Sequence, residues 1–456
     1  MKFSKHLIAV ATTAALLAPA TASATAGYFS LAYGAKSRGI AGAATALSQD
    51  TYAAAVNPAG MAKAVGTNDV GILIFSPIRE AETGASPTAF GGVGQIRSKS
   101  GSDGFIIPSG GFVRQLNDKM TWGMSIYANG GLNTAYEHDV TVPTMAGPTD
   151  GNLFGFPNEA LGVDLAQLIF APTITYALNK DHTVGASLLI GYQQFKAYGL
   201  QGFCGLKSAT FGDNTCAATG GPNSAASNDG LTNQGYDNAW GVGLRVGWQG
   251  KLSENVSVGA AYSTKVYMNE FDKYDELFAE DGDFDIPANW SIGISGKVSP
   301  KMTLSADIQQ ILYSDVKSIA NDGPGAGLGM SAAPGQQLGF DGGLGFGWED
   351  VTVFKIGAVY EHNDKFTYRF GYAHNTQAFD DDQLAFNVLA PAVIRDHVTA
   401  GFTYRPDGKD DQQVTFTFMH AIEASQRGVF PADFGGGSTR LQMYQNAFDF
   451  QYSWTY

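Results

Sequence analysis

The chain of 456 residues carries few charges for its size and an excess of glycine. Only 15% of its residues are charged, against about 25% in an average soluble protein, and 58 are glycines. Its 29 Phe and 20 Tyr residues exclude a disordered chain, because solvated coils are poor in aromatic side chains. The net charge of −14, with 28 Lys and Arg against 42 Asp and Glu, argues against a nucleic-acid partner.

The N-terminus has the three parts of a secretory signal peptide. Two lysines form a basic start, residues 7–17 are apolar, and Ala22-Ser23-Ala24 is a small-residue cleavage site. We predict a signal peptide over residues 1–24, with cleavage after Ala26 as the alternative. No later run of 18 apolar residues could form a transmembrane helix. The chain is therefore predicted to leave the cytoplasm without a helical anchor.

Residues 25–66 differ in composition from everything that follows. They are rich in Ala and Gly, with short helical stretches and no two-residue alternation. From residue 67 onward, apolar residues alternate with small or polar ones, which is typical of half-buried β-strands. We therefore predict a separate N-terminal segment over 25–66 and a β-domain over 67–456.

The alternation places large apolar side chains on one face of each predicted strand. Clear examples are residues 239–248, 256–266, 365–374 and 448–456. Their other face carries Gly, Ser, Thr and occasional charges, whereas a soluble barrel buries its large apolar residues and exposes its charges. An apolar exterior on an exported chain is typical of a transmembrane β-barrel.

Short and long connections alternate along the β-domain. Outer-membrane barrels have short periplasmic turns and longer extracellular loops. The short polar connections lie at 117–119, 179–181, 253–255, 299–301, 363–365 and 406–411, and the longer stretches lie near 80–103, 135–162, 200–234, 269–284, 315–350, 377–391 and 425–439. The pattern predicts an all-β fold, a fourteen-stranded antiparallel transmembrane β-barrel with the N-terminal segment as a hatch (plug) in its lumen.

Cys204 and Cys216 are the only two cysteines, and both lie in a Gly/Asn/Ser-rich stretch. A lone pair in an oxidising compartment most often forms a disulfide, so we predict this bond. None of the seven His residues lies in that stretch, so we expect no metal site there and no cofactor. The chain also lacks a Gly-x-Ser-x-Gly nucleophile motif, and we assign no catalytic residue.

A group of basic residues lies on the faces opposite the apolar runs. Charges facing lipid would be costly, so we predict that these side chains point into the lumen. A buried cation suits a carboxylate, which makes the group a candidate site for a substrate carboxylate. For any single residue, a structural network with Asp and Glu is the alternative. The five candidates are Arg245, Lys265, Lys355, Arg369 and Arg395.

Asn129-Gly130-Gly131 forms a second candidate site, within the predicted third strand over 120–134. Glycine in a strand interior weakens the strand and often marks a bulge or a bend. The alternative is that the strand ends at Ala128 and that the three residues begin the following loop.

The stretch GIAGAATALSQDTYAAAVNPAGMA resembles the N-terminal hatch of the FadL/TodX family, outer-membrane channels of Gram-negative bacteria for long-chain fatty acids and other hydrophobic compounds. The similarity continues in AYGAKSRGIAGA and in residues 161–200. The resemblance implies that Asn57, Pro58 and Ala59 form the hatch motif. A simple turn is the alternative, because Asn-Pro favours turns. The resemblance also implies a kink in the third strand at Asn129-Gly130-Gly131 that opens the wall toward lipid.

The sequence thus predicts a passive outer-membrane channel and no enzyme, with long-chain fatty acids as the first candidate substrates. We expect capture on external loops and lateral exit at the third strand, with Asn57 as the hydrogen-bond partner of the broken strand. Aromatic or alkane hydrocarbons taking the same route are an alternative, and an outer-membrane enzyme or adhesin is an alternative of another class. We expect a monomer in contact with outer-membrane lipid and its hydrophobic substrate.

Overall fold

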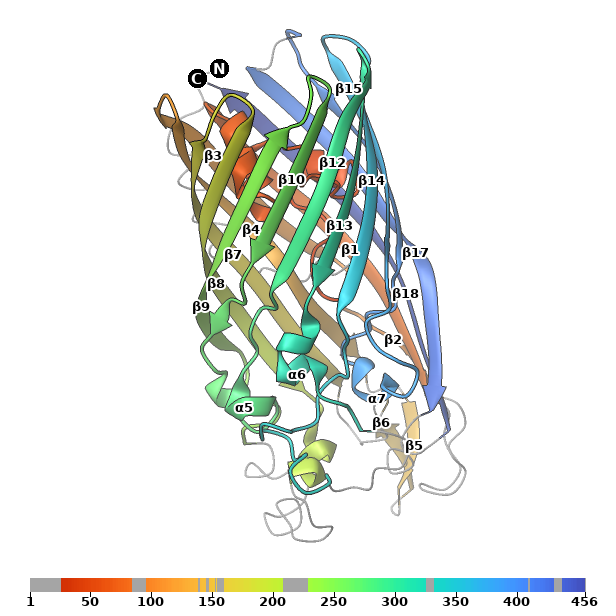
Figure 1. The fold of residues 1–456 in the computed structure, drawn as a ribbon. Coiled ribbons are helices and arrows are strands. Elements are labelled where there is room, and N and C mark those ends of the chain that lie inside the picture. The colour runs from red at the N-terminus through yellow and green to blue at the C-terminus, as the bar shows by residue number, and fades with distance from the viewer. Residues whose placement is uncertain are drawn as a thin grey trace, which may run out of the picture.

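The computed structural model describes residues 26–83, 96–137, 140–144, 147–151, 153, 160–207, 229–324, 332–408, 411–429 and 437–455. The predicted signal peptide lies outside these residues and stays a prediction. Within the described ranges, one antiparallel sheet closes on itself into a barrel (Figure 1). No helix in this part of the chain is long and apolar enough to cross a membrane.

Fourteen strands of the described chain form the wall, each pairing with its neighbours in sequence order. They are β1 (Thr67–Thr83), β3 (Phe105–Asn117), β4 (Met120–Tyr136), β7 (Leu161–Ala177), β8 (His182–Tyr198), β9 (Asp237–Lys251), β10 (Val256–Ser263), β12 (Asn289–Ser299), β13 (Met302–Ile311), β14 (Val351–Glu361), β15 (Phe366–Asn375), β16 (Asp396–Tyr404), β17 (Gln412–Val429) and β18 (Ser438–Thr455). The ring closes where β1 pairs with β18, from Thr67↔Thr455 to Thr83↔Thr439. The predicted fourteen-stranded barrel is confirmed.

The remaining short elements of the β-domain belong to the longer connections. Two of them extend the sheet, since β2 pairs with β1 and β11 pairs with β9, while β5 and β6 form a separate hairpin. Figure 1 shows β5, β6, α5, α6 and α7 together at one end of the barrel. The bounds are β2 (Ile96–Lys99), β5 (Val140–Thr144), β6 (Gly147–Gly151), η3 (Gln201–Lys207), β11 (Tyr267–Met268), η4 (Asp272–Tyr274), α5 (Ala279–Gly282), η5 (Tyr313–Asp315), α6 (Lys317–Ala320) and α7 (Leu384–Asn387).

Side chains of the short turns at the opposite end explain why these connections reverse the chain. Asn117 Oδ1 accepts hydrogen bonds from the backbone N–H groups of Lys119 and Met120. Asn179 and Asn363 make the same two bonds in their own turns. Such Asx turns replace backbone bonds over a few residues. All six predicted short connections join neighbouring strands here.

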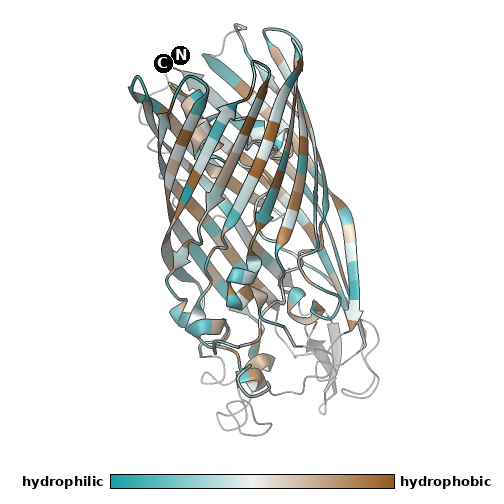
Figure 2. Cartoon of the chain, viewed as in Figure 1, coloured by the Kyte–Doolittle hydropathy of each residue, from teal (hydrophilic) through white to brown (hydrophobic). Residues whose placement is uncertain are grey.

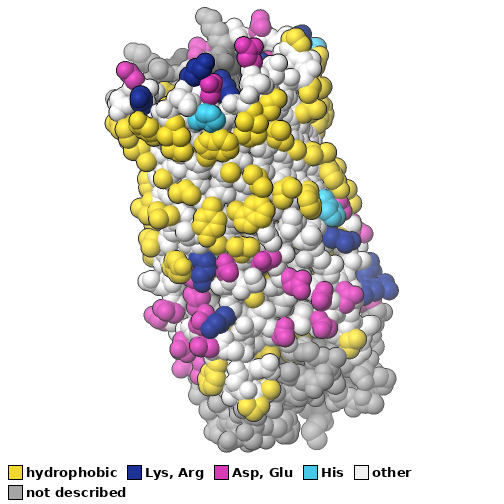
Figure 3. Space-filling model, in the orientation of Figure 1, with side chains coloured by type: hydrophobic (Ala, Val, Ile, Leu, Met, Phe, Trp, Pro, Cys, Tyr) yellow, Lys and Arg dark blue, Asp and Glu magenta, His cyan; other side chains and the backbone are white. Residues whose placement is uncertain are grey.

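The two faces of the wall differ in polarity, as the alternation predicts. On β9, Trp240, Val242 and Leu244 point outward and are 51%, 57% and 54% exposed, whereas Arg245 is 4% exposed. Along the strands, hydrophobic and hydrophilic residues follow one another (Figure 2). A belt of hydrophobic side chains surrounds the upper part of the visible face, and charged side chains gather below it (Figure 3). Such a belt is the surface that faces lipid.

The N-terminal segment, residues 26–66, lies inside the barrel, nearer the short turns than the long loops (Figure 1). Three short helices organise it: α2 (Ala35–Arg38), η1 (Thr51–Ala55) and η2 (Pro58–Lys63). Most of its residues are buried, and its hydrogen bonds reach different sides of the wall. The backbone N–H groups of Ala35, Thr45 and Thr51 donate to Gln451 on β18, Asp307 on β13 and Asp69 on β1.

Candidate functional site

The wall is interrupted between β3 and β4. These two strands pair only from Gly110↔Ile126 to Asn117↔Met120, although β4 continues to Tyr136. The rest of β3 pairs with β1 on its other side, as far as Phe75↔Phe105. Over most of its length beyond Ile126, the edge of β4 that faces β3 therefore has no strand of the wall beside it.

Asn129-Gly130-Gly131 lies on this edge of β4. The strand runs through these residues, so the alternative in which it ends at Ala128 is wrong. Opposite β7, Ala128 pairs with Leu168 and Gly130 with Gln167, which leaves Asn129 as one extra residue. One extra residue is a β-bulge, which bends a strand and increases its twist.

Residues Tyr28–Ser30 of the N-terminal segment occupy the place of the missing strand. Ser30 N donates to the Asn129 carbonyl at 2.8 Å, and Gly131 N donates to the Tyr28 carbonyl at 3.1 Å. Phe29 and Gly130 form an antiparallel bridge between these bonds. A Cβ atom on Gly130 would lie 1.9 Å from the Tyr28 carbonyl oxygen, so glycine is required for this approach. Nothing in the sequence pattern of residues 26–30 signalled this role.

Tyr313, on the long-loop side, holds Ala26, Tyr28 and Phe29. Its hydroxyl donates to the Ala26 carbonyl at 2.6 Å and accepts from the N–H groups of Tyr28 and Phe29 at 3.1 and 3.3 Å. The Tyr313 ring meets the Tyr28, Phe29 and Trp348 rings with centroids 5.3, 5.8 and 5.0 Å apart. Tyr28 and Phe29 are thus embedded in an aromatic cluster.

Apolar packing continues from this cluster into the long loops. Tyr28 contacts Phe284, which contacts Phe278, which contacts Phe195 on β8. A cavity of about 30 Å³ remains among these side chains, room for roughly one water molecule. A hydrophobic molecule could enter only if the side chains moved apart. Residues lining the cavity include Phe195, Leu200, Phe203, Phe278, Phe346 and Phe386.

The predicted hatch motif lies against β8 and β9, away from the edge of β4. Asn57 caps η2, because its Oδ1 accepts from Ala59 N at 3.1 Å. Its Nδ2 donates at 2.9 Å to the carbonyls of Thr45 and Trp248, the latter on β9. The prediction that Asn57 partners the broken third strand is therefore wrong. Its bonding groups are used by η2, Thr45 and β9, and Tyr28–Ser30 serve the broken strand instead.

Glycines on the inner face let this motif approach the wall. A Cβ on Gly185 would lie 2.5 Å from Ala59 N, and one on Gly247 would lie 2.1 Å from Asn57 Oδ1. A Cβ on Gly259 would lie 2.2 Å from the Thr45 carbonyl oxygen. These distances are far below normal contact, so a larger residue at any of these three positions would push the segment away.

Three of the predicted lumen cations bind the N-terminal segment. Arg245 Nη1 donates to the carbonyls of Ala54 and Ala55 at 3.1 and 2.6 Å and to the Tyr127 hydroxyl at 3.0 Å. Lys355 Nζ donates to the Leu31 carbonyl at 3.0 Å. Arg369 Nε donates to Gln49 Oε1 at 2.8 Å. All three cationic side chains are buried, as predicted, and all three hold the segment in place.

The other two predicted cations lie elsewhere. Strand β10 ends at Ser263, earlier than the predicted stretch, and Lys265 forms an ion pair with Asp285 at 2.8 Å beyond it. Arg395 precedes β16 and is exposed, so its predicted position in the lumen is wrong. The parity argument fails there because it assumed that the strand alternation extends to residue 395.

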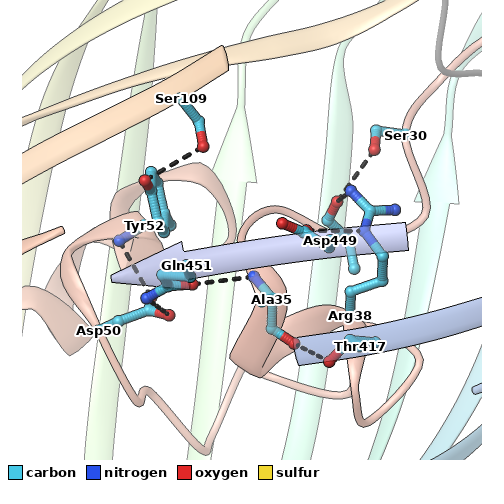
Figure 4. A network of polar contacts seen from close by, with 10 residues as sticks. Ser30, Ala35, Arg38, Asp50, Tyr52, Ser109, Thr417, Asp449 and Gln451 are labelled. Atoms are coloured by element: carbon cyan, nitrogen blue, oxygen red, sulfur yellow. Dashed lines mark hydrogen bonds and ion pairs between the residues drawn. The ribbon is translucent and has the colours of Figure 1, made fainter. Parts of the chain in front are cut away.

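A buried polar network ties the segment to β3, β17 and β18 (Figure 4). Gln451 Nε2 donates to Asp50 Oδ2 at 3.1 Å and to Asp69 Oδ1 at 2.9 Å. Arg38 and Asp449 form an ion pair at 3.0 Å, with both side chains 4% exposed. Burial, helped by the neighbouring Asp69 carboxylate and opposed by Lys36, raises the pKa of Asp50 to about 7.

Cys204 is buried on η3 among the long loops. Its predicted partner Cys216 lies outside the described residues, so the disulfide stays a prediction.

Comparisons with known proteins give consistent results. The family described as "Outer membrane protein transport protein (OMPP1/FadL/TodX)" matches residues 14–429. The long-chain fatty acid transport protein of Escherichia coli K12 is 21% identical over 347 residues, which cover 69% of this chain and 70% of that protein. The Pseudomonas putida toluene transporter TodX has a TM-score of 0.62 at 19% identity and covers 95% of this chain and 100% of its own.

A Pseudomonas aeruginosa FadL homologue has a TM-score of 0.65 at 15% identity, covering 94% of this chain and 100% of its own. At identities this low, the solved structures show a shared fold.

Replacing Asn57 with Ala should loosen the N-terminal segment without unfolding the barrel. The change removes the hydrogen bonds to Ala59, Thr45 and Trp248, and a lost cap alone costs about 1 kcal/mol. Hydrogen exchange across η1 and η2 should become faster in the variant. Asn446→Ala, the same change on the outer face, is the control and should leave that exchange unaltered. Equal protection in both variants would contradict the assigned anchoring role.

The docking of the segment should weaken as pH rises. The docked state raises the pKa of Asp50 from 3.8 to about 7. The contribution of Asp50 to the free energy of docking is therefore fully present below pH 3.8. It is lost as pH passes through the higher value, since Asp50 then becomes charged beside Asp69. Exchange of η1, corrected for intrinsic rates, should be faster at about pH 8 than at about pH 5. Asp50→Asn should abolish the difference, and a persistent difference would refute the assignment to Asp50.

Proposed function

This chain belongs to the FadL/TodX family of outer-membrane transport proteins, and from that premise we propose that it takes up hydrophobic compounds. Members of the family are transport channels, not enzymes, and are outer-membrane β-barrels of Gram-negative bacteria. Long-chain fatty acids, which the Escherichia coli relative transports by its name, are the first candidate substrates. Aromatic hydrocarbons are the second, because aromatic side chains fill the lumen on the long-loop side.

Capture is proposed to occur in the long loops. The packing of Phe195 against Phe278, and of Phe278 against Phe284, leads inward to Tyr28. A hydrophobic ligand that separates these rings replaces apolar contacts with apolar contacts, so the cost in buried area is small. The cavity of about 30 Å³ then corresponds to a closed state.

The N-terminal segment is proposed to act as the hatch. Its hydrogen bonds to β1, β4, β9, β13, β14 and β18 support this role, because they close the lumen near the short turns. A ligand that entered from the loops would meet Tyr28–Ser30 first. Displacing these residues would free the edge of β4 while η2 stayed anchored through Asn57.

Lateral exit between β3 and β4 is proposed for the last step. The single observation that carries it is the stretch of β4 beyond Ile126, which β3 does not pair with. Tyr28–Ser30 of the segment bond to its middle, the Arg79 side chain donates to the Asn133 carbonyl, and Ser100 and Gly101 meet its far end at Tyr136 and Ala135. An exit into lipid avoids moving an alkyl chain through water, which costs about 0.8 kcal/mol per CH₂. For a long acyl tail the saving is roughly 10 kcal/mol.

The charge of the substrate separates the two candidates. A carboxylate at Arg245 or Lys355 would have to replace the carbonyls of Ala55 or Leu31, which those cations now bind. Such an exchange would undock the segment and couple fatty-acid binding to opening. An uncharged aromatic compound needs no exchange, and it would move the segment only by occupying the space beside Tyr28.

The function is tested by uptake into cells that lack their own transporter of this kind. Expression of this chain should raise the initial uptake rate of a labelled long-chain fatty acid, of toluene, or of both, over cells with an empty vector. Faster uptake of the fatty acid supports the first candidate, and faster uptake of toluene alone supports the second. Uptake of neither compound by a correctly inserted barrel would refute the proposal.

Deleting Asn129 should block exit while leaving the barrel intact. The deletion removes the extra residue of the bulge and lets β4 follow β7 without a bend, since the pairs on either side keep their register. Uptake should fall to the level of the empty vector. The control is Asn129→Ala, which keeps the bulge but loses the side-chain bonds to Tyr33 and Gln167, and should retain most uptake. Equal uptake by both variants would place the exit elsewhere.

A further inference from the structure

The outer surface of the barrel carries a row of charged side chains near the long loops. Arg427 on β17 pairs directly with Arg440 on β18, Arg440 pairs with Glu82 on β1, and Glu82 pairs with Arg97 on β2. Arg427 and Arg97 are exposed, and Arg440 and Glu82 are half-buried. On each strand, the residues before and after the charged one face the lumen. We call these four residues the outer charged row.

The row lies just beyond the apolar belt. On β18, the outward residues Phe450 and Phe448 are 45% and 38% exposed, and toward the long loops they give way to Tyr444 and then to Arg440. In Figure 3, Lys and Arg side chains stand below the yellow belt at the right-hand edge, where Figure 1 shows the lower part of β17. Since long loops of such barrels are extracellular, the row is at the height of the outer-leaflet head groups.

Two arginines directly opposite each other are unfavourable on a strand pair. Among the described residues, ion pairs form with Arg97, which meets Glu80 at 2.5 Å, but none forms with Arg427 or Arg440. The acidic loop around Asp381 does not neutralise them on the outer face. Its backbone packs on the lumen side of the wall, where a Cβ on Gly428 would lie 1.8 Å from the Asp381 carbonyl oxygen.

We propose that Arg427 and Arg440 together bind a phosphate group of a phosphorylated glycolipid in the outer leaflet, of the lipopolysaccharide class. Guanidinium groups match phosphate oxygens in a forked geometry, and one anion between them removes the repulsion of the pair. Arg97, in register across Glu82, and Lys99 on the same face of β2 add positive charge nearby. Ile422, which is 43% exposed and nearer the apolar belt on β17, offers an apolar surface for the acyl chains.

Binding to the full-length mature barrel in detergent tests the proposal. The probes are bisphosphorylated lipid A, the same lipid without phosphates, and inorganic phosphate, with bound lipid counted by native mass spectrometry. For Arg427→Gln/Arg440→Gln, the Kd for phosphorylated lipid A should rise roughly tenfold, as expected for lost hydrogen bonds between charged groups. The dephosphorylated lipid should bind the unmodified barrel as weakly as phosphorylated lipid A binds the variant.

The matched control removes two positive charges at the other end of the barrel. Lys119→Gln/Lys180→Gln changes exposed turn residues and should leave the Kd unaltered. In lipid-free detergent the arginine variant should melt at a higher temperature than the unmodified barrel, because the like-charge pair is gone. With phosphorylated lipid A present, the order should reverse. Equal Kd values for the arginine variant and the control, or displacement of the lipid by an equal concentration of inorganic phosphate, would overturn the proposal.

Discussion

The structure depends on one constraint, that backbone groups within a membrane need hydrogen-bond partners. A barrel meets this constraint by closing its sheet, and each unpaired group in hydrocarbon would cost several kcal/mol. Between β3 and β4 the sheet does not pair fully, because β4 continues well past the last pair, Gly110↔Ile126. Tyr28–Ser30 supply some of the missing bonds from inside the lumen. Tyr28–Ser30 are therefore part of the wall where its strand pairing is interrupted.

The same constraint explains why the inner face is small and polar. An N-terminal segment can satisfy groups on the wall only if its backbone comes close, and the glycines at 185, 247 and 259 leave that space. Buried cations then bond to the carbonyls that the short helices leave unpaired, as Arg245 does for Ala54 and Ala55. The wall and the segment supply each other's hydrogen-bond partners, and each would have unpaired groups without the other.

In the proposed function, this mutual dependence couples closure to the contents of the lumen. A ligand beside Tyr28 competes for space with the aromatic cluster, and a ligand with a carboxylate competes with carbonyls for Lys355. Whichever contact is replaced, the ligand shifts the segment from its docked to its undocked state. The shift is as large as the difference between the ligand's affinities for these two states. On the outer face the requirement is simpler, since the outer charged row lies at the surface, where we propose that it meets lipid head groups.

The sequence by itself determined the architecture. Two-residue alternation, six short turns and the composition of 25–66 were enough for fourteen strands and an inner segment, because these depend on local periodicity and turn chemistry. The bend at Asn129-Gly130-Gly131 was also readable, since glycines mark bulges. The burial of Arg245, Lys355 and Arg369 followed from their parity. These features are each encoded within about one strand length of chain.

Only the tertiary structure decided which groups meet across the lumen. Asn57 bonds to β9 and not to the broken strand. Tyr28–Ser30, which carry no recognisable motif, pair with β4 instead. Arg395 faces outward because β16 begins one residue later. Such pairings join residues separated by as many as several hundred positions, and alternation along one strand holds no information about its distant partners. The geometry of the closed barrel sets them.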